Sequence, residues 1–187
     1  MQKIILASQS PRRKQLLEWA EIDFEVEISA ADENYPADLK ITDVPVFIAR
    51  SKAKAVQQKR NDKALIVAAD TIVVLNNTVI TKPLGRNEAI TILQSLSAQK
   101  HEVITGVVLL KGEKEISFAD TTEVEFHPLT NEQIIFYVDH YQPYDKAGAY
   151  AIQEWIGVVG IKSINGDFYN VMGLPVSRVV HHLQNSF

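Results

Sequence analysis

ILASQSPRRKQLLEWA, residues 5–20, predicts a short strand, a polar turn and a helix in direct succession. Two arginines, Arg12 and Arg13, stand in the first turn of the expected helix. A helix N-terminus carries a partial positive charge and favours acidic side chains, so two cations are locally unfavourable there. Something other than helix stability must therefore favour these two arginines.

A helical wheel places both arginines towards the core. Leu16, Leu17 and Trp19 mark the apolar arc of the helix, and Arg12 and Arg13 fall on that arc one turn earlier. Helix N-termini bind anions, and guanidinium groups bind phosphate oxygens bidentately. We therefore predict a phosphate site; the alternative is two arginines that snorkel from an ordinary helix. The preceding turn adds the hydroxyls of Ser8 and Ser10.

Two further charged residues stand in apolar surroundings. Lys52 falls within the apolar arc of a helix expected over 43–59, so its partner is either a core carboxylate or a phosphate. Asp70 interrupts the apolar run ALIVAADTIVVL at 64–75. In α/β proteins such a carboxylate often holds Mg²⁺ or acts as a base. The alternative is a turn aspartate between two strands.

Residues 71–82 predict a hairpin whose two-residue turn is the Asn-Asn pair at 76–77, because asparagine tolerates the positive φ of a type I′ turn. Continuing the pairing outwards sets Thr71 opposite Lys82, and hence Lys82 beside Asp70. A lysine in that place either favours the ionised acid or binds phosphates that a metal bridges.

A polar, proline-containing segment over 30–40 is expected to be a loop. Its Glu33 can complete a Mg²⁺ site, since this ion uses one or two carboxylates together with waters and phosphate oxygens. The alternative is an ordinary solvated acidic loop.

Strand-like and helix-like segments alternate along the chain, which predicts a layered α/β fold. The other expected strands are 23–29, 101–110, 115–126 and 157–167. The other expected helices are 87–98, 131–141 and 174–184.

The composition limits the classes of function. A length of 187 residues suits one domain, or one domain with a lobe. A net charge of -4 does not favour binding to nucleic acid polymers or anionic membranes, which need extended basic surface. The absence of cysteine excludes disulfides and thiolate chemistry and suits a reducing cytosol. With no signal-peptide or membrane-spanning pattern, we expect a soluble cytoplasmic protein.

Common catalytic signatures are also absent from the sequence. It contains no GxxxxGKS/T, GxGxxG, GxSxG or HExxH motif, and its five histidines show no metal-binding spacing. A serine triad is therefore unsupported.

Several motifs, in order along the chain, resemble the Maf family of nucleoside triphosphate pyrophosphatases, once named for septum formation inhibition. They are SQSPRR at 8–13, the helix with Lys52, AADTIV at 68–73, Lys82-Pro83, DKAGAYAIQ at 145–153 and NVMGLP at 170–175. The match runs from residue 4 to about 180, and several motifs in register are far more specific than any one of them.

The resemblance implies a single Maf-like domain over 1–187, similar to the inosine-triphosphate pyrophosphatase class. That fold has an elongated mixed β-sheet flanked by helices, with two lobes around a cleft. The resemblance also implies hydrolysis between the α and β phosphates of a nucleotide, giving a nucleoside monophosphate and pyrophosphate. It further implies a divalent metal, Mg²⁺ or Mn²⁺, and a homodimer.

This sequence resembles the branch of the family that acts on dTTP and UTP in two places. It has Ala-Asp-Thr around the acid, here 69–71, and Ala-Gly-Ala-Tyr, here 147–150, followed by a glutamine, here Gln153. The sister branch acting on 7-methyl-GTP usually has Ser-Asp-Gln at the acid. Arg12, Thr71 and Gln153 fall at the family's specificity positions, and the Gln153 amide can pair with the O4 and N3–H edge of a pyrimidine.

The charged residues and the resemblance together assign the roles. Asp70 and Lys82 are catalytic, and Asp70 orients or deprotonates the attacking water. Glu33 and Asp70 hold the metal. The phosphate-binding residues are Ser8, Ser10, Arg12, Arg13, Lys52 and Lys82. Two other functions stay open: a nucleotide-binding regulator of cell division without turnover, and the same chemistry on modified nucleotides.

Overall fold

The structure is a computed structural model that describes residues 3–28, 31–60 and 62–187. Its strands are β1 (Ile4–Leu6), β2 (Phe24–Val26), β3 (Leu65–Leu75), β4 (Thr78–Ile80), β5 (Lys100–Lys111), β6 (Lys114–Phe126) and β7 (Ile161–Asn165). Its helices are α1 (Pro11–Trp19), α2 (Val44–Lys59), α3 (Arg86–Leu96), α4 (Asn131–Tyr141), α5 (Trp155–Gly160), α6 (Phe168–Met172) and α7 (Val176–Ser186), with single 3-10 turns η1 (Ile41–Asp43) and η2 (Ala147–Ala149).

Within the described ranges, the strands form one sheet in the order β2-β1-β3-β5-β6-β7, with β4 paired to β3. β1 runs parallel to both β2 and β3, whereas β3 with β4 and β6 with β7 are antiparallel. The predicted mixed α/β fold is therefore confirmed.

The chain divides into two compact units. The first contains the described residues up to Thr71, together with Thr105–Asp120 and Gly173–Phe187. The second contains Ile72–Ile104 and Thr121–Met172. β3, β5 and β6 each contribute residues to both units.

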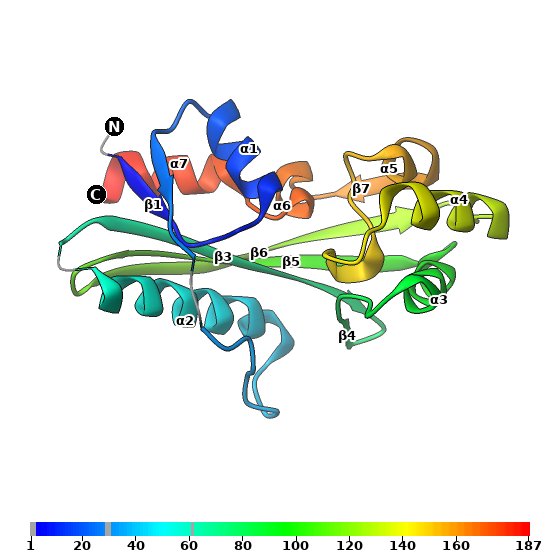
Figure 1. Ribbon diagram of the computed structural model, residues 1–187, viewed down its shortest axis with the longest axis horizontal. Helices are drawn as coiled ribbons and strands as arrows, with labels where there is room; N and C mark the ends of the chain where they lie inside the picture. Colours follow the sequence, from blue (N-terminus) through cyan, green and yellow to red (C-terminus); the bar gives the residue numbers. More distant parts are fainter. Residues whose placement is uncertain (1–2, 29–30, 61) are drawn as a thin grey trace. The chain divides into compact units, whose positions relative to one another are not determined.

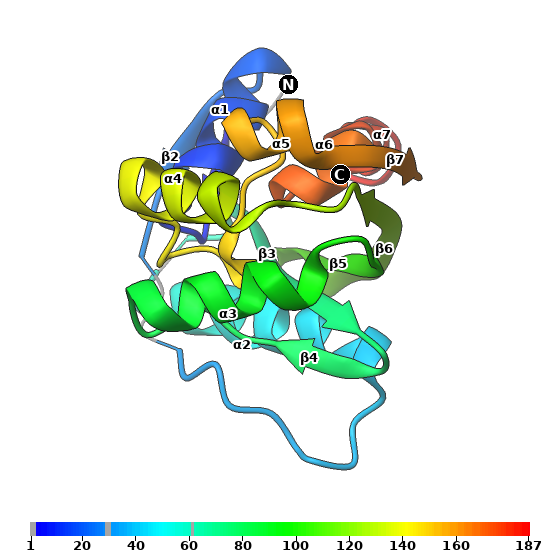
Figure 2. The same ribbon diagram turned by 90° about the vertical axis from the view of Figure 1, so that its right-hand side faces the viewer.

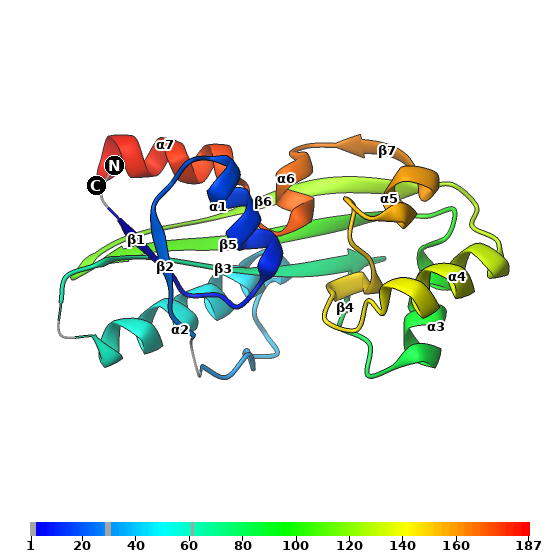
Figure 3. The same cartoon turned by 45° about the horizontal axis from the view of Figure 1, so that its top comes forward.

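In the first unit, α2 covers one face of the strands, and α1 and α7 lie on the opposite face (Figures 1 and 3). Alternate strand residues point to the same face, so they supply the apolar surface beneath α2. This cluster consists of Ile5, Ala7, Ile66, Ala68, Val108 and Leu110 from the strands and Ala49, Ala53 and Val56 from α2. The small alanines of α2 let the helix approach the sheet closely.

The closest approach of α2 to the sheet occurs at Gly106 of β5. A Cβ at this position would lie 2.2 Å from the backbone nitrogen of Val46 and 2.3 Å from the carbonyl carbon of Pro45. Only glycine fits there without moving the first turn of α2, in which Pro45 is also favoured by its fixed φ.

In the second unit, α3 packs against α4 (Figure 2). α4 begins with a capping box, in which the Thr130 hydroxyl accepts from the Gln133 N–H and the Gln133 side chain accepts from the Thr130 N–H. β7 pairs with β6 from Glu123 opposite Asn165 onwards.

A buried aromatic cluster also belongs to the second unit. His101 stacks on Phe126, and its Nε2 shares a hydrogen bond of 2.7 Å with the Tyr150 hydroxyl. Burial lowers the pKa of His101 to about 4 and raises the pKa of Tyr150. The His101 Nδ1 atom is buried and has no hydrogen-bond partner among the described residues. His101 is therefore neutral at neutral pH.

The predicted hairpin turn is confirmed, because Asn76 and Asn77 have φ values of 49° and 61° and Leu75 pairs with Thr78. The pairing ends at Val73 opposite Ile80, however, and does not reach residues 71 and 82. The extrapolation that set Lys82 beside Asp70 is therefore wrong as a statement about strand pairing.

Part of the predicted strand 157–167 is wrong, since Trp155–Gly160 form α5 and β7 begins only at Ile161. Packing overrides the β propensity of this segment, because Ile156 and Gly160 are buried. α6 was not predicted; Asp167 accepts a hydrogen bond from the Tyr169 N–H at its start.

The predicted strand 23–29 is shortened to Phe24–Val26. Its last residue, and the first residue of the loop predicted over 30–40, lie outside the described residues. Among the described helices, none combines the length and the apolar character needed to cross a membrane.

Candidate active site

Asp70 lies in the middle of β3, in a strand that runs unbroken from Leu65 to Leu75. β-Branched residues follow it in the sequence TIVV and keep the backbone extended. The alternative of a turn aspartate between two strands is therefore wrong. The Asp70 side chain is only 12% exposed, so it needs a partner for its charge.

Lys52 supplies that partner. Its Nζ lies 2.7 Å from Asp70 Oδ1 and 2.7 Å from Glu33 Oε1, and its side chain is 13% exposed. The lysine stands on the side of α2 that faces the sheet, which explains its place in the apolar arc. Of the two partners predicted for Lys52, the carboxylate is the one present in this structure.

Asp70 and Glu33 thus converge on a single cationic atom. Among the described residues, no group of three or more histidine, aspartate or glutamate side chains could hold a metal ion. Two convergent carboxylates without histidine suit Mg²⁺ or Mn²⁺, which take their remaining ligands from water and phosphate oxygens. They do not suit Zn²⁺, which prefers nitrogen and sulfur ligands. The residues present therefore fit the implied divalent cation.

Arg13 is buried and ties three segments of the first unit together. Its Nε donates to the carbonyl of Gly173 at 2.7 Å, its Nη1 to Ser8 Oγ at 3.0 Å and its Nη2 to Thr71 Oγ1 at 3.0 Å. Burial lowers the pKa of Arg13 to about 10, and the negative charge of Asp70 opposes this shift. The guanidinium stays charged at neutral pH, and these bonds orient it at the helix start.

Thr71 extends this network to β5. Its hydroxyl lies 2.9 Å from the hydroxyl of Thr105, which is fully buried. Because successive strand residues point to opposite faces, Asp70 meets α2 while Thr71 meets Arg13 of α1 on the other face. Two consecutive residues of β3 therefore bind side chains on opposite faces of the sheet.

The turn before α1 is ordered by the Ser8 hydroxyl, which accepts from the Ser10 N–H at 3.2 Å as well as from Arg13. Ser10 occupies the N-cap position of α1 without a side-chain cap bond. Arg12 is half-buried. Trp19, placed on the apolar arc by the helical wheel, is 58% exposed, so that part of the prediction is wrong.

Lys82 and Gln153 belong to the second unit and are both exposed. The first unit therefore brings together two groups of predicted residues. One group is Ser8, Ser10, Arg13 and Thr71, and the other is Lys52, Asp70 and Glu33. Arg12 precedes Arg13 on α1, and Lys82 and Gln153 are not placed with either group.

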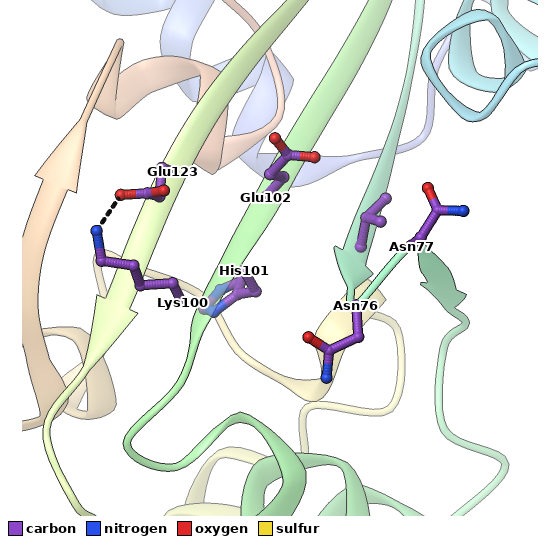
Figure 4. A pocket seen from close by; sticks show the side chains of 7 residues that line it. Asn76, Asn77, Lys100, His101, Glu102 and Glu123 are labelled. Carbon is purple, nitrogen blue, oxygen red and sulfur yellow. Dashed lines mark hydrogen bonds and ion pairs between the residues drawn. The ribbon is translucent and has the colours of Figure 1, made fainter.

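A hollow of about 210 Å³ lies in the second unit (Figure 4). Its lining residues are Val74, Asn76, Asn77, Lys100, His101, Glu102 and Glu123. Lys100 Nζ and Glu123 Oε1 form an ion pair of 2.8 Å across part of it. None of the predicted site residues lines this hollow.

A family model described as Maf-like protein matches residues 3–186. The chain belongs to the Maf family. This Maf protein is 53% identical to a dTTP/UTP pyrophosphatase from Cytophaga hutchinsonii, over 98% of its own length and 84% of the relative. It is 48% identical to a dTTP/UTP pyrophosphatase from Parabacteroides distasonis, over 98% and 95% of the two chains. A third such relative, from Porphyromonas gingivalis, is 44% identical over 98% and 94%.

Among solved structures, the Maf chain is similar to a nucleoside-triphosphatase / dITP/XTP pyrophosphatase from Mycobacterium abscessus. The identity is 16% and the TM-score 0.40, over 68% of this chain and 76% of that chain. A likeness this weak has no bearing on the function.

Sequence reasoning missed two members of the hydrogen-bond network around Arg13 and Thr71. Thr105 is a polar residue in the apolar run VITGVVLL of β5, and that pattern, which singled out Asp70, could have found it. Gly173 could not have been found in this way, because it contributes a backbone carbonyl from a loop at φ 116°.

Proposed function

We propose that this Maf protein hydrolyses dTTP and UTP to the nucleoside monophosphate and pyrophosphate. Three relatives that match nearly the whole chain at 44–53% identity are dTTP/UTP pyrophosphatases. The observation that carries the proposal is the cluster of Asp70, Glu33 and Lys52, in which two carboxylates meet at one cation. A binding protein without turnover has no need of a shielded acid in this arrangement.

Asp70 and Glu33 would hold the divalent cation, Mg²⁺ or Mn²⁺, which would supply positive charge against the phosphate oxygens. Asp70 also orients the attacking water or accepts its proton, for which its partly shielded position suits it. Lys52 exchanges its carboxylate contacts for phosphate oxygens and stabilises charge on the leaving pyrophosphate.

The start of α1 binds the rest of the triphosphate. The residues proposed for this role are Ser8, Ser10, Arg12 and Arg13. Three donors of Arg13 already bind protein groups. Arg13 keeps two N–H groups beyond those bonds, because a guanidinium has five.

The resemblance to the Maf family is the basis for the roles proposed for Lys82, Thr71 and Gln153. Lys82 completes the catalytic set and adds positive charge at the phosphates. Arg12, Thr71 and Gln153 select the substrate. The exposed Gln153 amide pairs with the O4 and N3–H edge that uracil and thymine share.

We further propose that the chain acts as one Maf-like domain over residues 1–187, in the cytoplasm and as a homodimer. Its role there is to remove nucleotides from the pool, modified pyrimidine nucleotides included. Its partner is the nucleoside triphosphate, and neither a nucleic acid polymer nor a membrane is part of the proposal. Light scattering of the purified protein measures the oligomeric state directly.

Pyrophosphate release from the purified protein with Mg²⁺ tests the activity across dTTP, UTP, CTP, GTP, ATP and 7-methyl-GTP. We expect dTTP and UTP to give the highest kcat/KM. A preference for 7-methyl-GTP would overturn the choice of branch. Nucleotide binding without release of pyrophosphate from any substrate would instead favour a regulatory protein.

A further inference from the structure

The turn that carries Gln153 is held on both sides by one buried hydroxyl. Tyr137 of α4 is fully buried. Its Oη accepts a hydrogen bond from the Ala151 N–H at 3.1 Å and donates one to the carboxylate of Glu154. The Glu154 N–H also donates to the Ala151 carbonyl at 3.1 Å, which closes the turn. Gln153 thus lies between two residues that share the same anchor.

The carboxylate end of this anchor has a second support. Lys146 Nζ lies 3.7 Å from Glu154 Oε1 and 2.7 Å from Asp145 Oδ1, and the Lys146 side chain is only 11% exposed. The Glu154 carbonyl accepts from the Gly157 N–H, so α5 starts directly from the anchored residue. The turn is therefore tied to α4, to η2 and to α5 within the second unit.

We propose that Tyr137 is a positioning residue for base selection. Through the Ala151 N–H and the Glu154 carboxylate, its hydroxyl fixes the backbone from which the Gln153 amide reaches the pyrimidine. This inference rests on the proposed function, in which Gln153 recognises the base.

The physical reason lies in the freedom of a glutamine side chain. Gln153 is exposed, and its rotatable bonds leave the amide mobile unless the backbone beneath it is fixed. Uracil offers an acceptor at O4 and a donor at N3, whereas cytosine offers a donor and an acceptor at the corresponding positions. An amide can match either pattern by turning over, so discrimination requires that it meet the base in one orientation.

The test compares wild type with Tyr137→Phe, which removes the hydroxyl and keeps the buried ring. We expect KM for dTTP and UTP to rise roughly fivefold and the preference for UTP over CTP, measured as kcat/KM, to fall roughly fivefold. We expect kcat for dTTP to stay within about twofold, because the variant removes no group from Asp70, Glu33, Lys52 or Lys82. If the hydroxyl had only a structural role, its removal would lower thermal stability and would change kcat/KM for all substrates by the same factor.

Tyr150→Phe is the matched control, since it removes another buried hydroxyl of the same unit, one bound to His101. Its UTP preference should equal that of wild type. A second pair of variants covers the case in which Tyr137→Phe does not fold. Glu154→Gln retains an acceptor for Tyr137 and should keep the preference, whereas Glu154→Ala should lose it.

Gln153→Ala separates this inference from the proposed function. If Gln153→Ala lowers the UTP preference while Tyr137→Phe and Glu154→Ala do not, the positioning role is overturned and base recognition stands. If Gln153→Ala leaves the preference of an active enzyme unchanged, base recognition by Gln153 fails, and the positioning role fails with it. Parallel loss in Gln153→Ala, Tyr137→Phe and Glu154→Ala supports both.

Discussion

At the scale of single residues, the proposed chemistry rests on three ionisable groups of the first unit, Lys52, Asp70 and Glu33. The Lys52 Nζ atom lies 2.7 Å from both carboxylates, so the shielded Asp70 and the exposed Glu33 share one compensating charge. Two nearby carboxylates without a cation would repel each other and destabilise the ionised forms. The Lys52 ammonium therefore offsets the mutual repulsion of the two carboxylates.

Asp70→Asn keeps the shape of the side chain and removes its charge and basicity. We expect kcat for dTTP to fall by roughly 10²- to 10⁴-fold with the fold retained, the range associated with loss of a general base. Pyrophosphate release and circular dichroism measure the two properties. Asp139→Asn is the control, because Asp139 forms an exposed ion pair with Arg86 in the second unit. Near-normal turnover of Asp70→Asn would contradict the assigned role.

Lys52→Met removes the ammonium that would compete with a metal ion for the two carboxylates. We expect Mn²⁺ to bind this variant about tenfold more tightly in the absence of nucleotide, because no ammonium must be displaced. Calorimetric titration of the apo protein with Mn²⁺ measures this affinity without turnover. Lys54→Met removes an exposed lysine of the same helix and should bind Mn²⁺ as wild type does. Weaker binding to Lys52→Met would show that Asp70 and Glu33 are not the metal ligands.

At the scale of elements, hydrophobic periodicity predicted most of the structure. The buried run of β3, the Asn-Asn turn and the amphipathic helix α4 follow from patterns that depend on neighbouring residues alone. α5 could not be predicted, because its β-branched sequence is overruled by the burial of Ile156 and Gly160 in the fold. The hydrogen bonds of Arg13 to Gly173 and Thr71 join residues far apart in sequence, so no local pattern indicates them.

Gly106→Ala tests the contact between α2 and β5. The added methyl group would lie 2.2 Å from the backbone of Val46, which a rigid backbone cannot accommodate. We expect a loss of about 2–4 kcal/mol in the free energy of unfolding, as for an overpacked core. Urea denaturation measures it. Gly85→Ala is the control, since a Cβ there would meet nothing within 4 Å. Equal stability of the two variants would contradict the close approach.

At the scale of the whole molecule, the residues to which we assign roles are divided between the two units. The first holds the acids, Lys52 and the start of α1, whereas the second holds Lys82 and the turn of Gln153. The second unit also contains the buried imidazole of His101, which makes the stability of the protein dependent on pH.

The pKa of His101 is lowered by burial from an ordinary value of 6.5 to about 4. Above pH 6.5 the imidazole is neutral in both the folded and unfolded states, so its contribution to stability is fully present. As the pH falls from 6.5 towards 4, the unfolded state binds a proton that the folded state does not, and stability is lost. We expect a loss on the order of 3 kcal/mol across this range.

Thermal unfolding between pH 7 and 4.5 measures this dependence. His101→Gln, which has no titrating group, should show a shallower loss of Tm with acid than wild type. His127→Gln is the matched control at an exposed histidine and should follow the wild-type curve. Identical slopes for wild type and His101→Gln would contradict the role of this imidazole.

The placement of Asp70 and Thr71 on opposite faces of β3 limits how this protein can evolve. Insertion or deletion of one residue in the strand before them would turn the acid towards α1 and the threonine towards α2. The contacts of Asp70 with Lys52 and of Thr71 with Arg13 would then be lost together. A change in the length of β3 therefore cannot alter one set of contacts while it keeps the other. Divergence of specificity must therefore proceed by substitution at fixed strand length, and an engineered change of substrate should preserve the length of β3.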